Sequence, residues 1–254
     1  MQKRGQVTVF IILGIALLMF ALALIYLNSY LATQEVKLNE ENELQNILFE
    51  DSIKEYVHSC ILSTTEAAIL ANSYSGGYFI LPEKSTENLF DNVPYYSLND
   101  KDLIPSNQTI ANEIAKYVDA MLNYCMDNFT SFQNQGYKIS EEKPQSKATL
   151  TSKKIIIRTN YPLTFSKGSS TTQLFNFIVS TPAPDFHQNI IMARKIIENQ
   201  DKKVICLTCF SNLAFENDMV VNIFSNENDT SIFEIENKNY LINNENVRLR
   251  FATK

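Results

Sequence analysis

The sequence predicts an α+β protein: an N-terminal transmembrane helix and a stalk helix, followed by an extracellular domain of antiparallel sheet with several helices. Three observations support this expectation. Residues 7–30 are predominantly apolar and uncharged, apolar residues then recur at helical spacing to about residue 71, and several later segments alternate between apolar and polar residues. Because the helical and alternating segments occur in separate blocks, they indicate the α+β class.

The apolar segment, residues 7–30, is long enough to cross a membrane. At a rise of about 1.5 Å per residue, roughly 24 helical residues span about 36 Å, more than a hydrocarbon core of roughly 30 Å. Leu, Ile, Phe and Val dominate the segment, and each favours insertion by roughly 0.3–0.6 kcal/mol. We therefore expect residues 7–30 to contact membrane lipid as a single-pass anchor.

The charges on either side of this segment predict its orientation. Lys3 and Arg4 lie in the short basic segment, residues 1–6, whereas four glutamates follow the apolar residues: Glu35, Glu40, Glu41 and Glu43. Cytoplasmic flanks of membrane helices carry an excess of Lys and Arg. We expect a cytoplasmic N-terminus in the cell membrane and a C-terminal domain outside the cell.

The N-terminal residues also carry a resemblance. Residues 3–8, KRGQVT, lead directly into the apolar helix and resemble the class III signal peptides of archaeal type IV pilins and archaellins. In that family a dedicated peptidase cleaves after the glycine, and the remaining helices pack as a filament core. The resemblance implies cleavage between Gly5 and Gln6. The sequence departs from the family at Phe10, where many pilins carry a glutamate.

The chain as a whole also resembles single-pass archaeal surface proteins with pilin-like N-termini. This likeness is loose and implies no particular activity.

A stalk helix is predicted over residues 31–77. Its apolar residues approximate an i, i+3, i+4 stripe, which would pack on the domain or against a partner's helix. Gly76 and Gly77 predict its end, because glycine accepts the left-handed conformation there. The stripe comprises Leu44, Ile47, Leu48, Ile53, Val57, Cys60, Ile61, Ala67, Ala68 and Ala71.

The first lobe of the domain is predicted over residues 78–184. A short strand at residues 78–81 and a turn-rich segment at 83–105 precede a helix capped by Ser106. The predicted buried face of this helix contains Ile110, Ile114, Val118, Met121, Leu122 and Cys125. An antiparallel meander follows, with strands at residues 137–141, 148–151, 155–165 and 173–180, and a hairpin turn at residues 167–170.

A second α+β lobe is predicted over residues 185–254. A helix runs from the Pro182–Pro184 punctuation to about residue 200, and a second helix begins near Cys206. The apolar face of the first helix contains Ile190, Ile191, Ile196 and Ile197. Strands are predicted at residues 219–225, 231–236, 239–242 and 247–252.

Four cysteines are the strongest candidates for covalent chemistry: Cys60, Cys125, Cys206 and Cys209. An even number in a domain outside the cell favours disulfides. Cys60 and Cys125 lie on the predicted inner faces of two helices, so we expect them to pair. Closing a loop of about 65 residues stabilises the fold by roughly 4 kcal/mol in the chain-entropy model.

Cys206 and Cys209 form a CxxC motif. The motif fits a structural disulfide or buried thiols, a redox-active pair at a helix N-terminus, or half of a metal site. Unlike the thioredoxin motif, it follows a helix and a polar turn. The redox-active interpretation of the CxxC pair nevertheless gives one alternative function, an exported thiol-disulfide oxidoreductase.

Other signals of enzyme activity are weak. The sequence contains no Gly-rich phosphate loop, HExxH motif or nucleophile elbow, and it has two histidines. We expect no catalytic residues, no metal site and no cofactor. The net charge of −6 and pI of about 5.1 argue against a nucleic-acid partner. Residues 226–229, NEND, could bind calcium but are more typical of a hairpin turn.

Three Asn-X-Thr triplets are candidates for N-glycosylation: Asn107, Asn128 and Asn228. Asn228, in a predicted turn, is favoured over Asn128, which lies near phenylalanines expected to be buried. Taken together, the sequence predicts a non-catalytic cell-surface protein for adhesion, scaffolding or surface assembly. Its partner would be a second copy of the chain or another surface protein. The alternative from the resemblance is a subunit of an archaeal type IV pilus-like filament.

Overall fold

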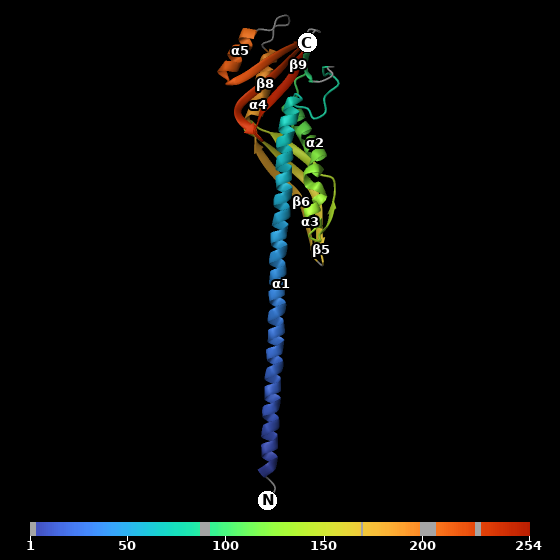
Figure 1. The fold of residues 1–254 in the computed structure, drawn as a ribbon, viewed down its shortest axis with the longest axis vertical. Coiled ribbons are helices and arrows are strands. Elements are labelled where there is room, and N and C mark those ends of the chain that lie inside the picture. Colours follow the sequence, from blue (N-terminus) through green and yellow to red (C-terminus); the bar gives the residue numbers. More distant parts are fainter. Residues whose placement is uncertain (1–3, 87–91, 169, 199–206, 227–229) are drawn as a thin grey trace. The chain divides into compact units, whose positions relative to one another are not determined.

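The computed structural model describes residues 4–86, 92–168, 170–198, 207–226 and 230–254. Within these ranges, the side chains of residues 4–11, 31–48, 207, 209, 225, 226, 238 and 240 are outside the description. The chain forms two compact units, Met1–Ile53 and Lys54–Lys254. The second unit combines helices with two sheets (Figure 1), and this confirms the predicted α+β class.

One long helix, α1 (Arg4–Tyr74), spans both segments that were predicted as helical. Its end agrees with the prediction from the glycine pair. Gly76 and Gly77 have φ of +63° and +85°, and the Gly77 N–H donates to the carbonyl of Asn72 at 2.6 Å. The left-handed pair therefore satisfies a carbonyl group that the helix end would otherwise leave without a partner.

The second helix, α2 (Asn107–Met126), begins as the sequence predicts. The Ser106 hydroxyl accepts a hydrogen bond from the Thr109 N–H at 3.0 Å. Ile110, Ile114, Val118 and Leu122 are fully buried, but Met121 is 36% exposed, contrary to the prediction. A 3₁₀ turn, η1 (Asp127–Phe129), and the short helix α3 (Thr130–Gln133) follow.

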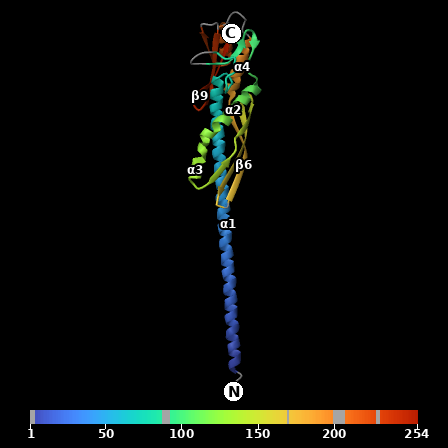
Figure 2. The ribbon, with the colours of Figure 1, turned by 90° about the vertical axis from the view of Figure 1, so that its right-hand side faces the viewer.

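The first sheet, called here the meander sheet, contains β3 (Lys138–Glu141), β4 (Gln145–Leu150), β5 (Lys154–Lys167) and β6 (Ser170–Pro182). β5 pairs antiparallel with β3 and β4 along one edge and with β6 along the other. The antiparallel pairing is thus confirmed, but the order is not that of a simple meander, because β3 pairs with β5 and not with β4. The free end of the β5–β6 hairpin lies at the same end of the unit as α3 in both ribbon views (Figures 1 and 2).

The second sheet, called here the C-terminal sheet, has the strand order β2-β1-β9-β8-β7. Its members are β1 (Tyr95–Leu98), β2 (Lys101–Asp102), β7 (Met219–Asn226), β8 (Thr230–Ile242) and β9 (Glu245–Thr253). β8 is one strand with an irregularity between Glu236 and Leu241, where the sequence predicted two strands. β1 pairs with β9 in parallel, and the other pairs are antiparallel.

Helices cover these sheets. α2 packs on β4, α4 (Pro184–Glu198) packs on β8 and β9, and α5 (Leu207–Glu216) packs on β7. In α4, Ile190 and Ile196 are buried, whereas Ile191 is 40% exposed, contrary to the prediction. The predicted border of the two lobes, after residue 184, falls at the first residue of α4. β1, which precedes this border, pairs with β9, which follows it.

The predicted strand at residues 78–81 is wrong, because the structure describes no strand there. The backbone N–H groups of Phe79 and Ile80 donate to the carboxylate of Glu113, each at 3.2 Å. Glu113 is 6% exposed and also binds Lys116 at 2.6 Å. A side chain of α2 therefore takes the place of a neighbouring strand.

An aromatic ladder holds the core of the C-terminal sheet together. Tyr96 of β1 stacks on Phe251 of β9 at 4.5 Å between ring centroids, and Phe251 stacks on Phe233 of β8 at 5.2 Å. Phe210 of α5 meets Phe233 edge-on at 5.8 Å. Because such pairs add to the free energy of burial, the ladder joins β1 to the C-terminal strands and α5 in one core.

Candidate functional site

The apolar segment Ile12–Tyr30 is the first candidate element. It comprises 19 residues with a mean hydropathy of 2.2, and every side chain in it is exposed. Soluble proteins rarely leave so large a continuous apolar surface in water. The segment is long and apolar enough to cross a membrane.

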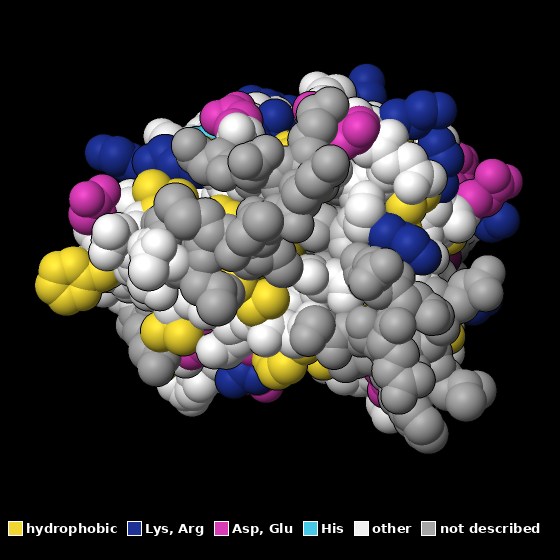
Figure 3. All heavy atoms as spheres, turned by 90° about the horizontal axis from the view of Figure 1, so that it is seen from above, with side chains coloured by type: hydrophobic (Ala, Val, Ile, Leu, Met, Phe, Trp, Pro, Cys, Tyr) yellow, Lys and Arg dark blue, Asp and Glu magenta, His cyan; other side chains and the backbone are white. Residues whose placement is uncertain are grey.

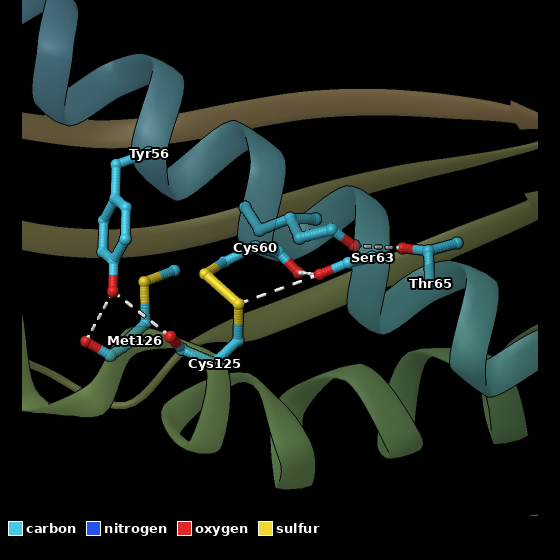
Figure 4. Close-up of a disulfide and its surroundings, with 7 residues drawn as sticks. Tyr56, Cys60, Ser63, Thr65, Cys125 and Met126 are labelled. Atoms are coloured by element: carbon cyan, nitrogen blue, oxygen red, sulfur yellow. Dashed lines mark hydrogen bonds between the residues drawn. A yellow bond between two sulfur atoms is a disulfide. The ribbon is translucent and has the colours of Figure 1, made fainter. Parts of the chain in front are cut away.

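The C-terminal part of α1, which lies within the second unit, is fixed covalently to α2. Cys60 and Cys125 form a disulfide with a Cα–Cα distance of 5.6 Å, the pairing that the sequence predicts (Figure 4). Cys60 is 4% exposed. Figure 4 shows α1 and α2 side by side in front of the strands, with the two sulfur atoms between them.

Tyr56 strengthens this junction at the C-terminus of α2. Its hydroxyl lies 3.2 Å from the carbonyl of Cys125 and 2.9 Å from that of Met126 (Figure 4). These are carbonyls of the last helical turn, which has no partners within the helix. Burial, and then the nearby Asp127, raise the pKa of the Tyr56 hydroxyl. The hydroxyl therefore stays protonated and able to donate.

The chain makes an abrupt turn below this junction. Asp127, Asn128 and Phe129 all have positive φ, at 44°, 49° and 55°. For a phenylalanine this conformation is unfavourable, but Phe129 is 1% exposed and meets Phe165 of β5 edge-on at 5.5 Å. Burial of the ring against the meander sheet offsets the local strain.

The far end of α1 is held by the C-terminal sheet. The Ser73 hydroxyl donates to the carbonyl of Arg248 at 2.8 Å, and the Tyr96 hydroxyl donates to the carbonyl of Gly76 at 3.0 Å. The guanidinium of Arg250 lies 4.5 Å from the centre of the Tyr74 ring. These contacts fix the end of α1 to the C-terminal sheet, while the disulfide and Tyr56 fix the preceding turns to α2.

An open groove of about 650 Å³ lies beside this helix end and is called here the turn groove. Its lining residues are Leu70, Ala71, Tyr74, Ser75, Asn244, Glu245, Asn246 and Arg248. The turn between β8 and β9 forms one wall. Asn243 and Asn244 in that turn have φ of 51° and 64°, the conformation of a type I′ hairpin turn.

Glu236 positions two of the lining side chains. Its carboxylate accepts a hydrogen bond from Asn246 Nδ2 at 2.6 Å and forms an ion pair with Arg248 Nε at 3.2 Å. Glu236 is 8% exposed, whereas the Arg248 side chain is 50% exposed. The sequence does not predict this groove. The Asn-Asn pair between two predicted strands was the available signal, but it marks a turn and not the helix end beside it.

A second groove, of about 610 Å³, lies between α2 and β4. Its lining includes Asp119 together with Lys116, Lys147 and Arg158. Burial raises the pKa of Asp119, although hydrogen bonds from Ser146 act in the opposite direction. The described lining therefore carries charges of both signs.

The remaining predicted site residues are partly described. Cys206 and Asn228 lie outside the described residues, and only the backbone is described at Gly5, Gln6 and Cys209. The redox prediction and the cleavage prediction therefore remain predictions. Residues 227–229 of the calcium alternative also lie outside the described residues, so this alternative stays a prediction.

Two glycosylation candidates are described. Asn107 is the exposed first residue of α2, and its Oδ1 lies 3.5 Å from Arg194 Nη2. Asn128 is exposed even though Phe129 and Phe132, on either side of Thr130, are buried. Asn128 was ranked below Asn228 because it lies near these phenylalanines. Their burial does not bury Asn128 itself.

The described residues contain no cluster of three or more His, Cys, Asp or Glu side chains that could hold a metal ion. In the end view of Figure 3, Lys and Arg side chains are intermixed with Asp and Glu side chains along the upper edge. Comparison of the chain with protein-family models, curated proteins and solved structures finds no match.

Proposed function

We propose that the chain is a cell-surface protein anchored by one N-terminal transmembrane helix, with a disulfide-tied extracellular α+β domain that serves adhesion, scaffolding or surface assembly. The observation that carries this proposal is the apolar segment Ile12–Tyr30, whose side chains are all exposed. It is part of the same helix that the Cys60–Cys125 disulfide joins to α2.

Two further observations support the proposed orientation. Lys3 and Arg4 precede the apolar segment and glutamates follow it, which favours a cytoplasmic N-terminus. Both cysteines of the disulfide follow the apolar segment in the sequence, whereas Lys3 and Arg4 precede it. Disulfides persist in oxidising compartments outside the cytoplasm.

The anchor is tested by replacing Leu17, Leu18 and Leu22 with lysine. Each lysine at the centre of a membrane helix costs roughly 2.5–3.5 kcal/mol, so we expect the variant to leave the membrane fraction under alkaline carbonate, while the natural chain stays. The matched control places lysines at Tyr124 and Phe215, which are 81% and 85% exposed in the second unit. This control is expected to remain in the membrane fraction.

Protease treatment of intact cells tests the orientation. We expect residues after the apolar segment to be degraded while a cytoplasmic marker stays intact. A domain that is protected until the cells are lysed would contradict the proposed location, and a natural chain that carbonate extracts would contradict the anchor.

A second candidate function is a pilin-like filament subunit, favoured by residues 3–8 and by the continuous helix that starts at Arg4. Mass spectrometry of the native protein separates the two functions. A chain that starts at Gln6 would favour the filament, and a Gly5→Val variant is then expected to retain its N-terminus. A native chain that retains Met1 would rule the filament out.

A further inference from the structure

The turn groove has the size and mixed walls of a small-molecule site. Its volume of about 650 Å³ lies within the range of roughly 300–1,000 Å³ for ligand pockets. The end of α1 supplies Leu70, Ala71 and the Tyr74 ring. The β8–β9 turn and the start of β9 supply amide and charged groups.

Tyr74 is a pre-positioned aromatic side chain. The ring is 46% exposed, and the guanidinium of Arg250 lies 4.5 Å from its centroid. Arg250 is itself 5% exposed and pairs with Glu234 at 3.6 Å. A cation over an aromatic ring is attractive, so the ring has a fixed support and still offers apolar surface to the groove. Such a surface suits the C–H face of a sugar ring.

The opposite wall offers hydrogen-bond donors and acceptors that are already held in place. Glu236 holds Nδ2 of Asn246 and Nε of Arg248. Within the described part of the chain, this leaves the amide oxygen of Asn246 and the Nη groups of Arg248 with no protein partner. The exposed Asn244 adds a second amide. A sugar hydroxyl both donates and accepts, so neighbouring amide and guanidinium groups match a pair of hydroxyls.

The charge of the lining favours a neutral ligand. Among the described lining residues, Arg248 is the one cation and Glu245 the one carboxylate, and Glu236 already pairs with Arg248. An anionic ligand would find no excess positive charge here. We propose that the turn groove binds a neutral oligosaccharide. The proposal is based on the Tyr74 ring, on the positioned Asn246 amide and Arg248 guanidinium, and on this charge balance. The proposal rests on the surface role above for the source of the glycan.

The test uses the full chain in lipid nanodiscs, so that no sugar-based detergent is present. The probe is an array of neutral, sulfated and sialylated oligosaccharides, followed by calorimetry with a neutral oligosaccharide that the array retains. We expect Tyr74→Ala and Arg248→Ala each to weaken binding at least tenfold. Tyr74→Phe keeps the ring and is expected to bind within about threefold of the natural chain.

Matched controls distinguish the groove from general surface effects. Tyr124→Ala removes an 81% exposed tyrosine from α2, and Arg158→Ala removes an exposed arginine from β5. Both are expected to bind as the natural chain does. If Tyr74→Ala fails to fold, Asn244→Gly removes one amide while allowing the same positive φ, and it is expected to weaken binding.

Four results would overturn the proposal: no oligosaccharide retained by the natural chain, equal binding by the groove variants, retention of charged glycans alone, or a peptide as the groove's ligand. The proposed anchor and the proposed oligosaccharide site can be contradicted independently of each other. Carbonate extraction does not depend on glycan binding, and the nanodisc measurement does not depend on the orientation in a cell.

Discussion

At Gly76 the backbone adopts a left-handed conformation in a place with no room for a side chain. Its φ is +63°, and an added Cβ would lie 2.4 Å from Cγ of Pro94 and 2.7 Å from the carbonyl oxygen of Arg250. Gly168, in the β5–β6 turn, has nearly the same φ of +60° but open space around it. A comparison of substitutions at the two glycines therefore distinguishes the cost of backbone strain from the cost of close packing.

We predict that Gly76→Ala destabilises the fold more than Gly168→Ala does. The strain of a left-handed alanine is roughly 1–2 kcal/mol at both positions, and overpacking at Gly76 adds about 1–3 kcal/mol. Urea unfolding followed by circular dichroism measures both free energies. Equal losses would contradict the close packing of the helix end on β1 and β9.

A second prediction concerns pH and His187 in α4. Burial lowers the pKa of His187 from its ordinary value of 6.5, and Arg194 lowers it further. Nδ1 of His187 is buried, and no described residue hydrogen-bonds to it. Between the lowered pKa and 6.5 the unfolded chain binds a proton that the folded chain does not. The free energy of unfolding therefore falls as the pH falls through this window.

His187→Gln removes this contribution, so we expect a flatter dependence of unfolding free energy on pH between about 7.5 and 5.5. A slope that His187→Gln leaves unchanged would mean that other groups control stability in this range.

At the scale of elements, the Cys60–Cys125 bridge joins two helices across 65 residues of sequence. The chain-entropy model assigns such a loop roughly 4 kcal/mol, a large part of the net stability of a domain. We predict that Cys60→Ala combined with Cys125→Ala lowers the melting temperature by roughly 8–16 °C, at about 2–4 °C per kcal/mol.

Calorimetry with and without reductant checks this prediction. Reductant is expected to lower the melting temperature of the natural chain and to leave that of the double variant unchanged. A Cys206→Ser and Cys209→Ser variant serves as a control for the CxxC motif. If reductant destabilises the double variant as much as the natural chain, the effect does not come from the helix bridge.

Elements with local signals were predictable from the sequence. The Ser106 cap, the Gly76–Gly77 stop and the alternation in β5 depend on residues a few positions apart, and all three appear in the structure. β1 was missed because its neighbours in the sheet give little local signal: β2 has two residues, and β9 lies more than 140 residues later in the chain. The strand expected at residues 78–81 failed because a distant carboxylate, Glu113, took its backbone N–H groups.

The candidate site was predictable only in part. Cysteine spacing on two amphipathic helices was sufficient to pair Cys60 with Cys125, and the apolar run was sufficient to identify the candidate anchor. The turn groove combines a helix end with a hairpin turn about 170 residues later. No local pattern could bring Tyr74 and Arg248 together before β9 was placed beside α1.

At the scale of the whole molecule, the division after Ile53 separates the apolar segment from a second unit that contains both sheets. We predict that a chain starting at Lys54 folds without detergent, because it retains Tyr56, Cys60 and the end of α1. Gel filtration and thermal melting by circular dichroism measure this. An aggregated or unfolded product would show that the fold requires residues of the first unit.

The covalent bond near the start of the second unit also determines how the protein would respond to a mechanical pull. Tension entering along α1 reaches Cys60 soon after Lys54 and is passed to α2 through sulfur, so the 65 residues of the bridged interval cannot be drawn out. At about 3.3–3.6 Å per extended residue, roughly 220 Å of chain stays out of reach of the force. Only a reducing environment would release that length.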